Sequence, residues 1–402
     1  MREDPTMSKK LSVRRLEFER DRRVFCRVDY NVPIKDGKVG DDTRIAASLP
    51  TLKLLSEKGA RTVLVSHLGR PKGKPTPEFS LKPVADHLAS LLGKPVAFSE
   101  TCIGEAAEKC SREIEPGGFL VIENVRFHKE EEGNDAAFAA ALARLGDLYV
   151  NDAFGSAHRA HASTAGVPAL LKPAAAGLLM EAELEHLGRL LEHPDSPFVA
   201  ILGGAKVSDK IELIENLMPR VDQFLVGGAM AYTFLKALAK PTGLSPIEED
   251  RTTLAKALIQ KARAAGKEFL FPVDHVVTVG GKDDVHHVTS GADIVDQESG
   301  VDIGPKTAEL FAARIARART VLWNGPLGRF EIEAFSHGTR KVAEALATSA
   351  AVSVVGGGDS ASAVKKFGLS ARMTHVSTGG GASLEFLSGL PLPGVEALDD
   401  AS

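Results

Sequence analysis

The sequence predicts an α/β protein with two lobes, each a mostly parallel sheet flanked by helices, joined by a hinge helix. Short apolar runs rich in β-branched residues alternate with longer stretches of Ala, Leu, Glu and Lys. The runs are apolar throughout rather than at every second residue, which is typical of strands covered on both faces. The chain has 402 residues, more than one domain usually contains, so two cores are expected.

Strand-length apolar runs mark the predicted sheets. They are Val24–Val28, Thr62–Ser66, Phe119–Ile122, Leu148–Val150, Phe198–Leu202, Gln223–Val226, Glu268–Val273, Thr320–Trp323, Val352–Val355 and Thr374–Val376. Helix-like stretches lie between many of them, among them Ser80–Leu92, Asp135–Leu145, Lys206–Asn216, Asp250–Ala265 and Thr307–Ala318. This alternation is the pattern of βαβ units in a parallel sheet.

One amphipathic helix is expected to connect the two lobes. Its leucines are spaced along a single face, and prolines follow it before the next strand. The strand ends before this helix carry Arg and His, whereas those after it carry Gly and Lys, which suggests two different ligands. The predicted division is a first domain over residues 1–176, the hinge helix over 177–193 and a second domain from residue 194 onward.

Composition narrows the class of protein. The net charge of −4 argues against a broad nucleic-acid surface, so any anion site must be local. Cys26, Cys102 and Cys110 show neither a disulfide framework nor a metal-binding spacing. The charged N-terminus lacks an apolar signal core, and no apolar run is long enough to span a bilayer, so a cytoplasmic location is expected. Translation could start at Met1 or Met7.

Arginine and histidine side chains gather after the strands of the first half. The guanidinium group binds phosphate or carboxylate bidentately and stays charged at any working pH. Any single arginine is more often a surface ion-pair partner, but several at strand ends favour a small, doubly anionic ligand. His67 and His158 each lie near an arginine at a strand end, whereas His128 and His161 are interpreted as structural. The arginines are Arg27, Arg44, Arg70, Arg126 and Arg159.

In the second half of the sequence, glycine and lysine residues follow the strands instead of arginine and histidine. The segment Gly203–Lys210 follows a strand and is predicted to open a helix, with Lys206 and Lys210 on one helical face. Two ammonium groups near a helix start can reach a polyphosphate. Spacing alone leaves open that both are ordinary solvated lysines.

Two further turns combine a strand, glycines and a helix start. In Val354–Ala361 the glycines allow a phosphate to approach the backbone amides of a helix N-terminus. Asp359 at that turn can bind Mg²⁺ together with phosphate oxygens, or it is only the helix N-cap. A second such turn over Thr378–Ser383 favours a phosphate site.

Two other classes of function compete with a phosphate-transfer enzyme. Gly356–Ala361 matches the dinucleotide fingerprint G-x-G-x-x-A, but the next strand ends in Ser377-Thr378-Gly379 without the carboxylate that a dehydrogenase needs. A non-catalytic phosphometabolite-binding protein would use the same cations without turnover. The nucleotide P-loop and the protein-kinase motifs are both missing from the sequence.

Taken in order, the motifs cover nearly the whole chain, and the sequence resembles the phosphoglycerate kinase family. They are Arg27–Pro33, Ser66–Pro71, Gly203–Lys210, Gly227–Lys236, Trp323–Phe335, Gly356–Ser360 and His375–Ser383. The resemblance implies two Rossmann-like lobes that close about the hinge, a monomer, and residues 387–402 returning to the first lobe. It implies a phosphotransferase with a carboxyl acceptor: reversible, Mg²⁺-dependent, direct in-line transfer between 1,3-bisphosphoglycerate and ADP. The products are 3-phosphoglycerate and ATP, in glycolysis and gluconeogenesis.

The resemblance also implies roles for individual residues. The triose phosphate would contact Asp29, Asn31, Arg44, His67, Leu68, Gly69, Arg70, Arg126 and Arg159. The nucleotide would contact Lys210, Gly228, Asn324, Pro326, Glu331, Gly357, Gly358, Asp359 and Ser360, with Asp359 binding Mg²⁺. Charge on the migrating phosphoryl group would be stabilised by Arg44, Lys206, Lys210, Gly358 and Gly380.

Overall fold

The computed structural model describes residues 10–401 and divides into two compact units. The first unit runs up to Glu185 and is completed by the segment that begins at Pro391, whereas the second unit is His186–Leu390. Helix α7 (Leu178–Glu192) spans the point where the first unit gives way to the second. The choice between Met1 and Met7 lies outside the described residues.

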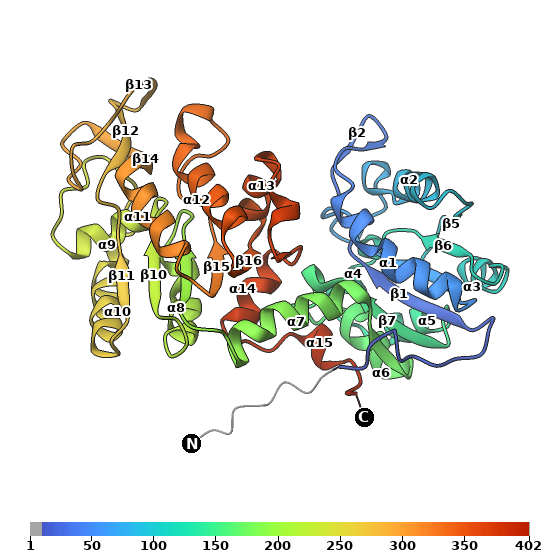
Figure 1. The fold of residues 1–402 in the computed structure, drawn as a ribbon. Coiled ribbons are helices and arrows are strands. Elements are labelled where there is room, and N and C mark those ends of the chain that lie inside the picture. The colour runs from blue at the N-terminus through green and yellow to red at the C-terminus, as the bar shows by residue number, and fades with distance from the viewer. Residues whose placement is uncertain (1–9, 402) are drawn as a thin grey trace. The chain divides into compact units, whose positions relative to one another are not determined.

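The first unit is built on a six-stranded parallel sheet in the order β5-β6-β4-β1-β7-β8 (Figure 1). Its central strands are fully buried because βα crossovers cover both faces. The strands are β1 (Arg23–Val28), β4 (Arg61–Val65), β5 (Ala97–Ser99), β6 (Phe119–Ile122), β7 (Leu148–Asp152) and β8 (Ala174–Ala176), beside a hairpin of β2 (Ile34–Lys35) and β3 (Lys38–Val39).

Right-handed crossovers that run in opposite directions along a sheet place their helices on opposite faces. The strand order therefore puts α1 and α2 on one face, and α3 and α5 on the other. An ion pair of 3.6 Å between Arg144, just after α5, and Glu108 of α3 agrees with this placement. The helices are α1 (Thr43–Glu57), α2 (Lys82–Leu92), α3 (Glu105–Arg112), α4 (Lys129–Glu132), α5 (Ala136–Ala143), α6 (Val167–Leu170) and α15 (Pro393–Glu396).

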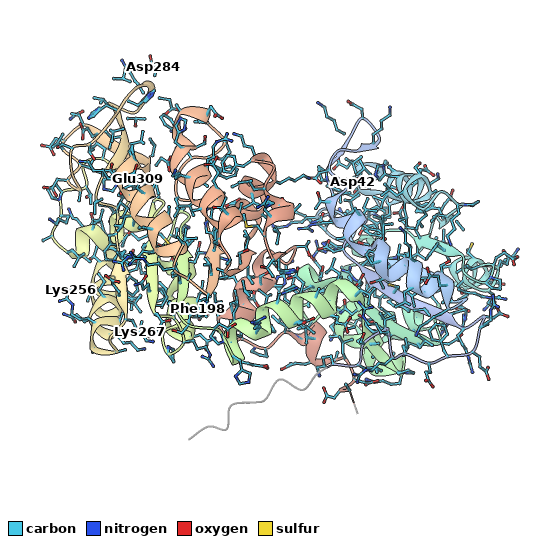
Figure 2. All side chains as sticks on the ribbon, viewed as in Figure 1. Asp42, Phe198, Lys256, Lys267, Asp284 and Glu309 are labelled. Carbon is cyan, nitrogen blue, oxygen red and sulfur yellow. The ribbon has the colours of Figure 1, made fainter. Side chains whose placement is uncertain are left out.

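The second unit has its own six-stranded parallel sheet, in the order β11-β10-β9-β15-β16-β17. Its core includes Trp323, which is fully buried, and Phe198, labelled in Figure 2. The strands are β9 (Phe198–Leu202), β10 (Gln223–Val226), β11 (Glu268–Leu270), β15 (Thr320–Asn324), β16 (Val352–Gly356) and β17 (His375–Val376). A small antiparallel sheet adds β12 (His275–Val279), β13 (Lys282–Val288) and β14 (Glu298–Ile303).

The helices of the second unit also cover both faces of its sheet. The crossover directions place α8 and α10 on one face, and α12 and α13 on the other, where α11 packs with α12 around Trp323. The helices are α8 (Ile211–Leu217), α9 (Met230–Ala237), α10 (Thr252–Ala264), α11 (Pro305–Ile315), α12 (His337–Thr348), α13 (Gly358–Lys366) and α14 (Gly381–Leu387).

Single helical turns complete the fold. One is a π-helical turn, η4 (Ala162–Gly166), and the others are 3₁₀ turns. The 3₁₀ turns are η1 (Pro77–Phe79), η2 (Val125–Phe127), η3 (Phe154–Ser156), η5 (Ser208–Lys210), η6 (Glu249–Arg251), η7 (Glu333–Phe335) and η8 (Ser370–Arg372). None of the helices in the described part of the chain is long and apolar enough to cross a membrane.

The predicted α/β class with two parallel sheets is confirmed, and each predicted apolar run overlaps a strand of one of them. The edge strands β5 and β8 were not predicted. The antiparallel sheet of β12, β13 and β14 was not predicted. Every residue of β13 is exposed, so this strand carries none of the continuous apolarity that marks the others. The predicted helix over Lys206–Asn216 is wrong in its first turn, because α8 begins only at Ile211.

The C-terminal segment lies within the first unit. The backbone N–H of Leu11 donates to Asp399 O at 2.7 Å, and the N–H of Asp399 donates to Ala174 O at 2.9 Å. The N–H of Gly394 donates to Ala157 O at 2.8 Å. Residues from both ends of the described chain therefore complete this unit beside β8.

Asp152, at the end of β7, holds the first turn of α7. Its Oδ1 accepts hydrogen bonds from the backbone N–H groups of Leu179, at 2.9 Å, and Met180, at 3.3 Å. A Cβ atom on Gly177 would lie 2.1 Å from this oxygen, so only glycine fits there. Burial raises the pKa of the Asp152 carboxyl group to about 6.

This raised pKa predicts a pH dependence of stability. Between about pH 4 and 6 the unfolded chain releases the Asp152 proton while the folded chain keeps it, so stability should fall as pH rises, by up to about 3 kcal/mol. Asp152→Asn should remove this part of the slope, measured as urea unfolding free energy against pH. Asp284→Asn, at an exposed position (Figure 2), is the control. Equal slopes for wild type and Asp152→Asn would contradict the prediction.

Candidate functional site

The first unit gathers its polar loops at one edge of its sheet. Because all its strands run parallel, their carboxyl ends meet there. Asp29 and Asn31 follow β1, while His67 and Arg70 follow β4. Arg126 lies in the turn after β6, and Arg159 follows β7.

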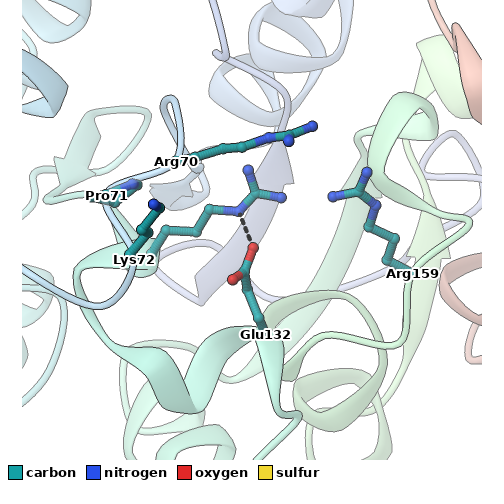
Figure 3. Close-up of a pocket in the computed structure, with 6 residues that line it drawn as sticks. Arg70, Pro71, Lys72, Glu132 and Arg159 are labelled. Atoms are coloured by element: carbon teal, nitrogen blue, oxygen red, sulfur yellow. Dashed lines mark ion pairs between the residues drawn. The ribbon is translucent and has the colours of Figure 1, made fainter.

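A cavity of about 320 Å³ lies at this edge. Figure 3 shows the guanidinium groups of Arg70 and Arg159 directed toward the same space. Arg126 is only 7% exposed, and its Nε lies 3.3 Å from Glu132 Oε1. Positive side chains thus outnumber the single carboxylate, so the cavity suits an anion. It is lined by Arg70, Pro71, Lys72, Arg126, Glu132 and Arg159.

Predicted and unpredicted residues meet in this cavity. Arg70, Arg126 and Arg159 were predicted from the sequence, whereas Lys72 and Glu132 were not. Lys72 could have been found from its place in the same loop as Arg70. Glu132 carried no such signal, because it lies in a run of glutamates at the end of α4 that looks like a solvated surface.

Asn124 ties the loops after β4 and β6 together. Its Nδ2 donates to Leu68 O at 2.7 Å, and its Oδ1 accepts from the backbone N–H of Arg126 at 3.0 Å. Asn31 Oδ1 accepts from the N–H of Gly69 at 2.9 Å. Leu68 and Gly69 therefore fix the loop that presents Arg70, through their backbone groups rather than their side chains.

The other predicted ligands of this unit do not line the cavity. Arg44, in the first turn of α1, makes a 2.9 Å ion pair with Asp29 Oδ2. His67 is 6% exposed, and its Nδ1 lies 3.1 Å from a terminal nitrogen of the Arg27 guanidinium group. Burial lowers the pKa of His67 well below its usual value, and nearby Arg27 and Arg126 lower it further, so the ring is neutral.

The second unit brings three glycine-rich turns into backbone contact. The N–H of Gly203, after β9, donates to Asn324 O at 3.0 Å, and the N–H of Gly204 donates to Pro326 O at 2.9 Å. The N–H of Gly228, after β10, donates to Leu327 O at 3.1 Å. Strand ends β9, β10 and β15 therefore form one continuous surface of main-chain groups.

Lys210 lies against this surface. Its Nζ donates a hydrogen bond to Asn324 Oδ1, a neutral acceptor, so the ammonium charge is not cancelled by an ion pair within the described residues. Burial lowers its pKa, while the charges of Asp209 and Asp359 act in the opposite direction. Asn324 Nδ2 is buried without a hydrogen-bond partner among the described residues, and a Cβ on Gly356 would lie 3.3 Å from it. This amide donor therefore faces the Gly356–Gly357 turn.

The prediction that Lys206 shares a helical face with Lys210 is wrong. Lys206 is exposed in an irregular segment, and Lys210 ends the 3₁₀ turn η5. Glu248 holds this segment out of helix: its carboxylate accepts from the N–H of Val207 and from the hydroxyl of Ser208, the latter at 2.6 Å. The lysines reach the same side of the sheet through a loop rather than along one helix.

The turn after β16 leads directly into α13. Gly357, with φ of 89°, is the N-cap residue, and no side chain caps the helix, so the interpretation of Asp359 as only an N-cap is wrong. Asp359 is exposed in the first helical turn. The Ser360 hydroxyl accepts from the N–H of Gly325 at 2.6 Å, which ties α13 to the Asn324 loop. Free amides at this helix start can bind phosphate oxygens.

Two predicted residues lie at the margins of this surface. Gly380, with φ of 55°, precedes α14 and offers amides of the same kind. Glu331 is exposed, and its backbone O accepts from Lys366 Nζ of α13 at 2.9 Å. Its carboxylate is therefore open to a hydroxyl-bearing ligand.

A magnesium ion that arrives with a polyphosphate fits these residues. Asp359 supplies one exposed carboxylate, and the described residues hold no cluster of three or more His, Cys, Asp or Glu side chains suited to a metal. Mg²⁺ usually takes one or two protein carboxylates and completes its shell with phosphate oxygens and water. The donor set therefore fits a nucleotide-bound ion rather than a metal held by protein alone.

The fold and these sites define an α/β phosphate-binding protein with an arginine-lined anion cavity in one unit and a glycine- and lysine-rich polyphosphate surface in the other. The family model described as "Phosphoglycerate kinase" matches residues 13–390. The chain belongs to the phosphoglycerate kinase family. The dehydrogenase alternative is therefore wrong.

Relatives and solved structures match nearly the whole chain. The phosphoglycerate kinase of Koribacter versatilis is 53% identical over 401 residues, which covers 97% of this chain and 99% of the relative. That of Dictyoglomus turgidum is 55% identical and covers 94% and 96%. The structure of phosphoglycerate kinase from Coxiella burnetii has a TM-score of 0.87 at 44% identity, covering 96% and 98%. The crystal structure from Pyrococcus horikoshii has a TM-score of 0.84 at 35% identity, with the same coverage.

Proposed function

We propose that the first unit binds phosphoglycerate and the second binds the nucleotide in the ATP-forming glycolytic reaction of the phosphoglycerate kinase family. The arginine-lined cavity is the observation that supports this assignment of one ligand to each unit. Three guanidinium groups and Lys72 surround about 320 Å³ in the first unit, which suits a small phosphorylated acid. The second unit instead presents amides and Lys210, which suit a polyphosphate.

In the first unit, Arg70, Arg126 and Arg159 are proposed to hold the phosphate that is not transferred. Asp29 and Asn31 would hydrogen-bond the glycerate hydroxyl and carboxyl groups. Arg44 would face the carboxyl group and the phosphoryl group in transfer, and His67 would donate a hydrogen bond to the ligand. Leu68 and Gly69 would contribute through the backbone of the loop that Asn124 and Asn31 hold.

In the second unit, the main-chain surface is proposed to hold the nucleotide. Lys210 would contact the polyphosphate, and the start of α13 would bind it through Gly357, Gly358 and Ser360. Gly228, Asn324 and Pro326 would line the nucleoside pocket, with Glu331 on the ribose. Asp359 would hold Mg²⁺, which when bound neutralises phosphate charge.

The transfer itself requires alignment and charge neutralisation rather than a base. The acceptor is a carboxylate, which is already ionised, so no proton has to be removed. Arg44, Lys206 and Lys210 would stabilise charge on the migrating group, together with amides at Gly358 and Gly380. We propose direct in-line transfer without a phosphoenzyme, so no phosphohistidine should be trapped at His67 or His158.

The remaining proposals concern the whole chain. Water would compete as acceptor, so we propose that the units close on their ligands about α7. We propose that residues 1–176 form the domain that binds the triose phosphate, residues 177–193 the hinge helix and residues 194–386 the domain that binds the nucleotide. Residues 387–402 would return to the first domain. We also propose a cytoplasmic monomer that works without nucleic acid or membrane partners.

A coupled assay tests the proposal. The purified chain is given 3-phosphoglycerate, ATP and Mg²⁺, and product formation is followed through glyceraldehyde-3-phosphate dehydrogenase. Arg126→Lys keeps the charge but loses the guanidinium fork, so KM for 3-phosphoglycerate should rise roughly tenfold. Arg112→Lys, on the exposed side of α3, is the control. Ligand binding without turnover would favour the non-catalytic alternative, and an unchanged KM in Arg126→Lys would overturn the role of the cavity.

A further inference from the structure

A buried chain of hydrogen bonds runs behind the anion cavity and ends at His67. It begins at Glu131 of α4, which is fully buried, and passes through Ser163 of η4 and Arg27 of β1. Arg27 is 1% exposed and Ser163 is fully buried. None of these three side chains lines the cavity, and the proposed transfer chemistry uses none of them.

The contacts in this chain are short and continuous. The Ser163 hydroxyl lies 2.5 Å from Glu131 Oε1, and the Ser163 backbone N–H donates to Glu131 Oε2 at 3.0 Å. Arg27 Nε donates to the Ser163 hydroxyl oxygen at 2.8 Å. A terminal nitrogen of Arg27 then lies 3.1 Å from His67 Nδ1.

Donor and acceptor rules fix the direction of the hydrogen bond between Arg27 and His67. Arginine has only donors, so His67 Nδ1 must accept from Arg27. A neutral imidazole that accepts at Nδ1 carries its proton on Nε2. The Ser163 hydroxyl accepts from Arg27 Nε and donates its one proton to Glu131 Oε1. Both carboxylate oxygens of Glu131 therefore accept hydrogen bonds from Ser163. Burial raises the pKa of this carboxyl group, whereas Arg27 and the hydrogen bonds from Ser163 act in the opposite direction.

We propose that Glu131, acting through Ser163 and Arg27, is a positioning residue that keeps His67 as the Nε2–H tautomer, a hydrogen-bond donor to the anionic ligand of the first unit. The proposal rests on the proposed function, because it assigns the form in which His67 meets phosphoglycerate. The Nε2 atom makes no hydrogen bond within the described residues, and it is the nitrogen left for a ligand.

The surroundings of His67 oppose any other protonation state. Arg27, Arg44 and Arg126 all act on the ring as nearby positive charges, and burial disfavours the imidazolium form. His161 also faces this region, with its Nδ1 3.9 Å from Glu131 Oε1, and burial lowers its pKa to about 4. A neutral ring whose Nδ1 accepts from Arg27 can donate to an anion only through Nε2.

The carboxylate of Glu131 holds Ser163, whose hydroxyl oxygen accepts from Arg27 Nε and so positions the Arg27 guanidinium group against His67. A glutamine there has one acceptor oxygen, so it cannot accept both hydrogen bonds from Ser163, and its amide must donate to the hydroxyl oxygen. The hydroxyl oxygen then accepts from both the amide and Arg27 Nε, and the hydroxyl proton loses the oxygen to which it donates. Ser163→Ala removes the link while leaving Glu131 and Arg27 in place.

Nitrogen NMR of the full chain with labelled histidine tests the proposal without ligand. Wild-type His67, assigned by comparison with His67→Asn, should remain the neutral Nε2–H tautomer between about pH 5.5 and 8. An Nδ1–H ring or an imidazolium ion in the wild type would overturn the proposal without recourse to any variant. This measurement does not depend on turnover, so it is separate from a failure of the proposed function in the coupled assay.

Two variants and a control complete the test. Ser163→Ala and Glu131→Gln should let His67 exchange between tautomers and raise KM for 3-phosphoglycerate roughly three- to tenfold, with kcat changed much less. Ser111→Ala removes another fully buried hydroxyl, in α3 of the same unit, and should change neither readout. If both variants fold but keep the wild-type tautomer, Glu131 is not a positioning residue, even if KM rises.

Discussion

Replacing Lys210 by alanine is expected to lower kcat by at least about a hundredfold while the protein stays folded. The Lys210 ammonium group is half-buried against the glycine turns and is paired with the neutral Asn324 oxygen. Its charge is therefore available to the polyphosphate, and burial strengthens its attraction to phosphate oxygens. Alanine removes this charge and leaves the Asn324 oxygen without its donor.

The matched control for this prediction is Lys256→Ala. Lys256 is exposed on α10, as Figure 2 shows, and its removal should leave turnover within about twofold of the wild type. Both variants are compared by coupled assay and by ATP titration. Turnover that survives Lys210→Ala at more than about a tenth of the wild-type rate would refute the catalytic role of Lys210.

Gly228→Ala should be the most damaging small substitution in the second unit. Gly228 has φ of 65°, and a Cβ there would lie 2.6 Å from Gly204 N and 2.8 Å from Pro326 O. These are backbone atoms held by hydrogen bonds between the glycine turns, so they cannot move aside as a side-chain end could. We expect a loss of about 3 kcal/mol or more in unfolding free energy and weaker nucleotide binding.

The control for the glycine prediction lies in the same unit. A Cβ atom on Gly291 would meet nothing within 4 Å beyond its chain neighbours, and the residue does not have a positive φ. Gly291→Ala should therefore change stability by less than about 1 kcal/mol. Urea unfolding and ATP titration measure both variants. If Gly228→Ala unfolds within about 1 kcal/mol of the wild type, the turns are not packed as tightly as these distances require.

The sheets could be predicted because their physical cause is local. A strand buried on both faces must be apolar at successive positions, and each run from Val24–Val28 to Thr374–Val376 shows this. The turn after β16 could be predicted because glycine adopts a positive φ more readily than other residues, as at Gly357. The side chains that follow such strands then share one edge, which brought Arg70, Arg126 and Arg159 together in the prediction.

Features that depend on contacts between distant segments were not predictable. Lys206 lies outside a helix because Glu248 binds the backbone of its segment, and no local pattern reveals that contact. Glu132 enters the anion cavity through its ion pair with Arg126. Ser163 was overlooked because its role comes only from partners on other elements.

The segment from Pro391 onward sets an order of assembly during synthesis. The second unit, His186–Leu390, is contiguous, so all of its residues leave the ribosome before the last residues of the first unit do. The first unit must wait for Asp399, whose backbone bonds to both Leu11 and Ala174. The half of the molecule that is translated first is therefore the half that can finish folding last, and until then its surface beside β8 lacks its cover.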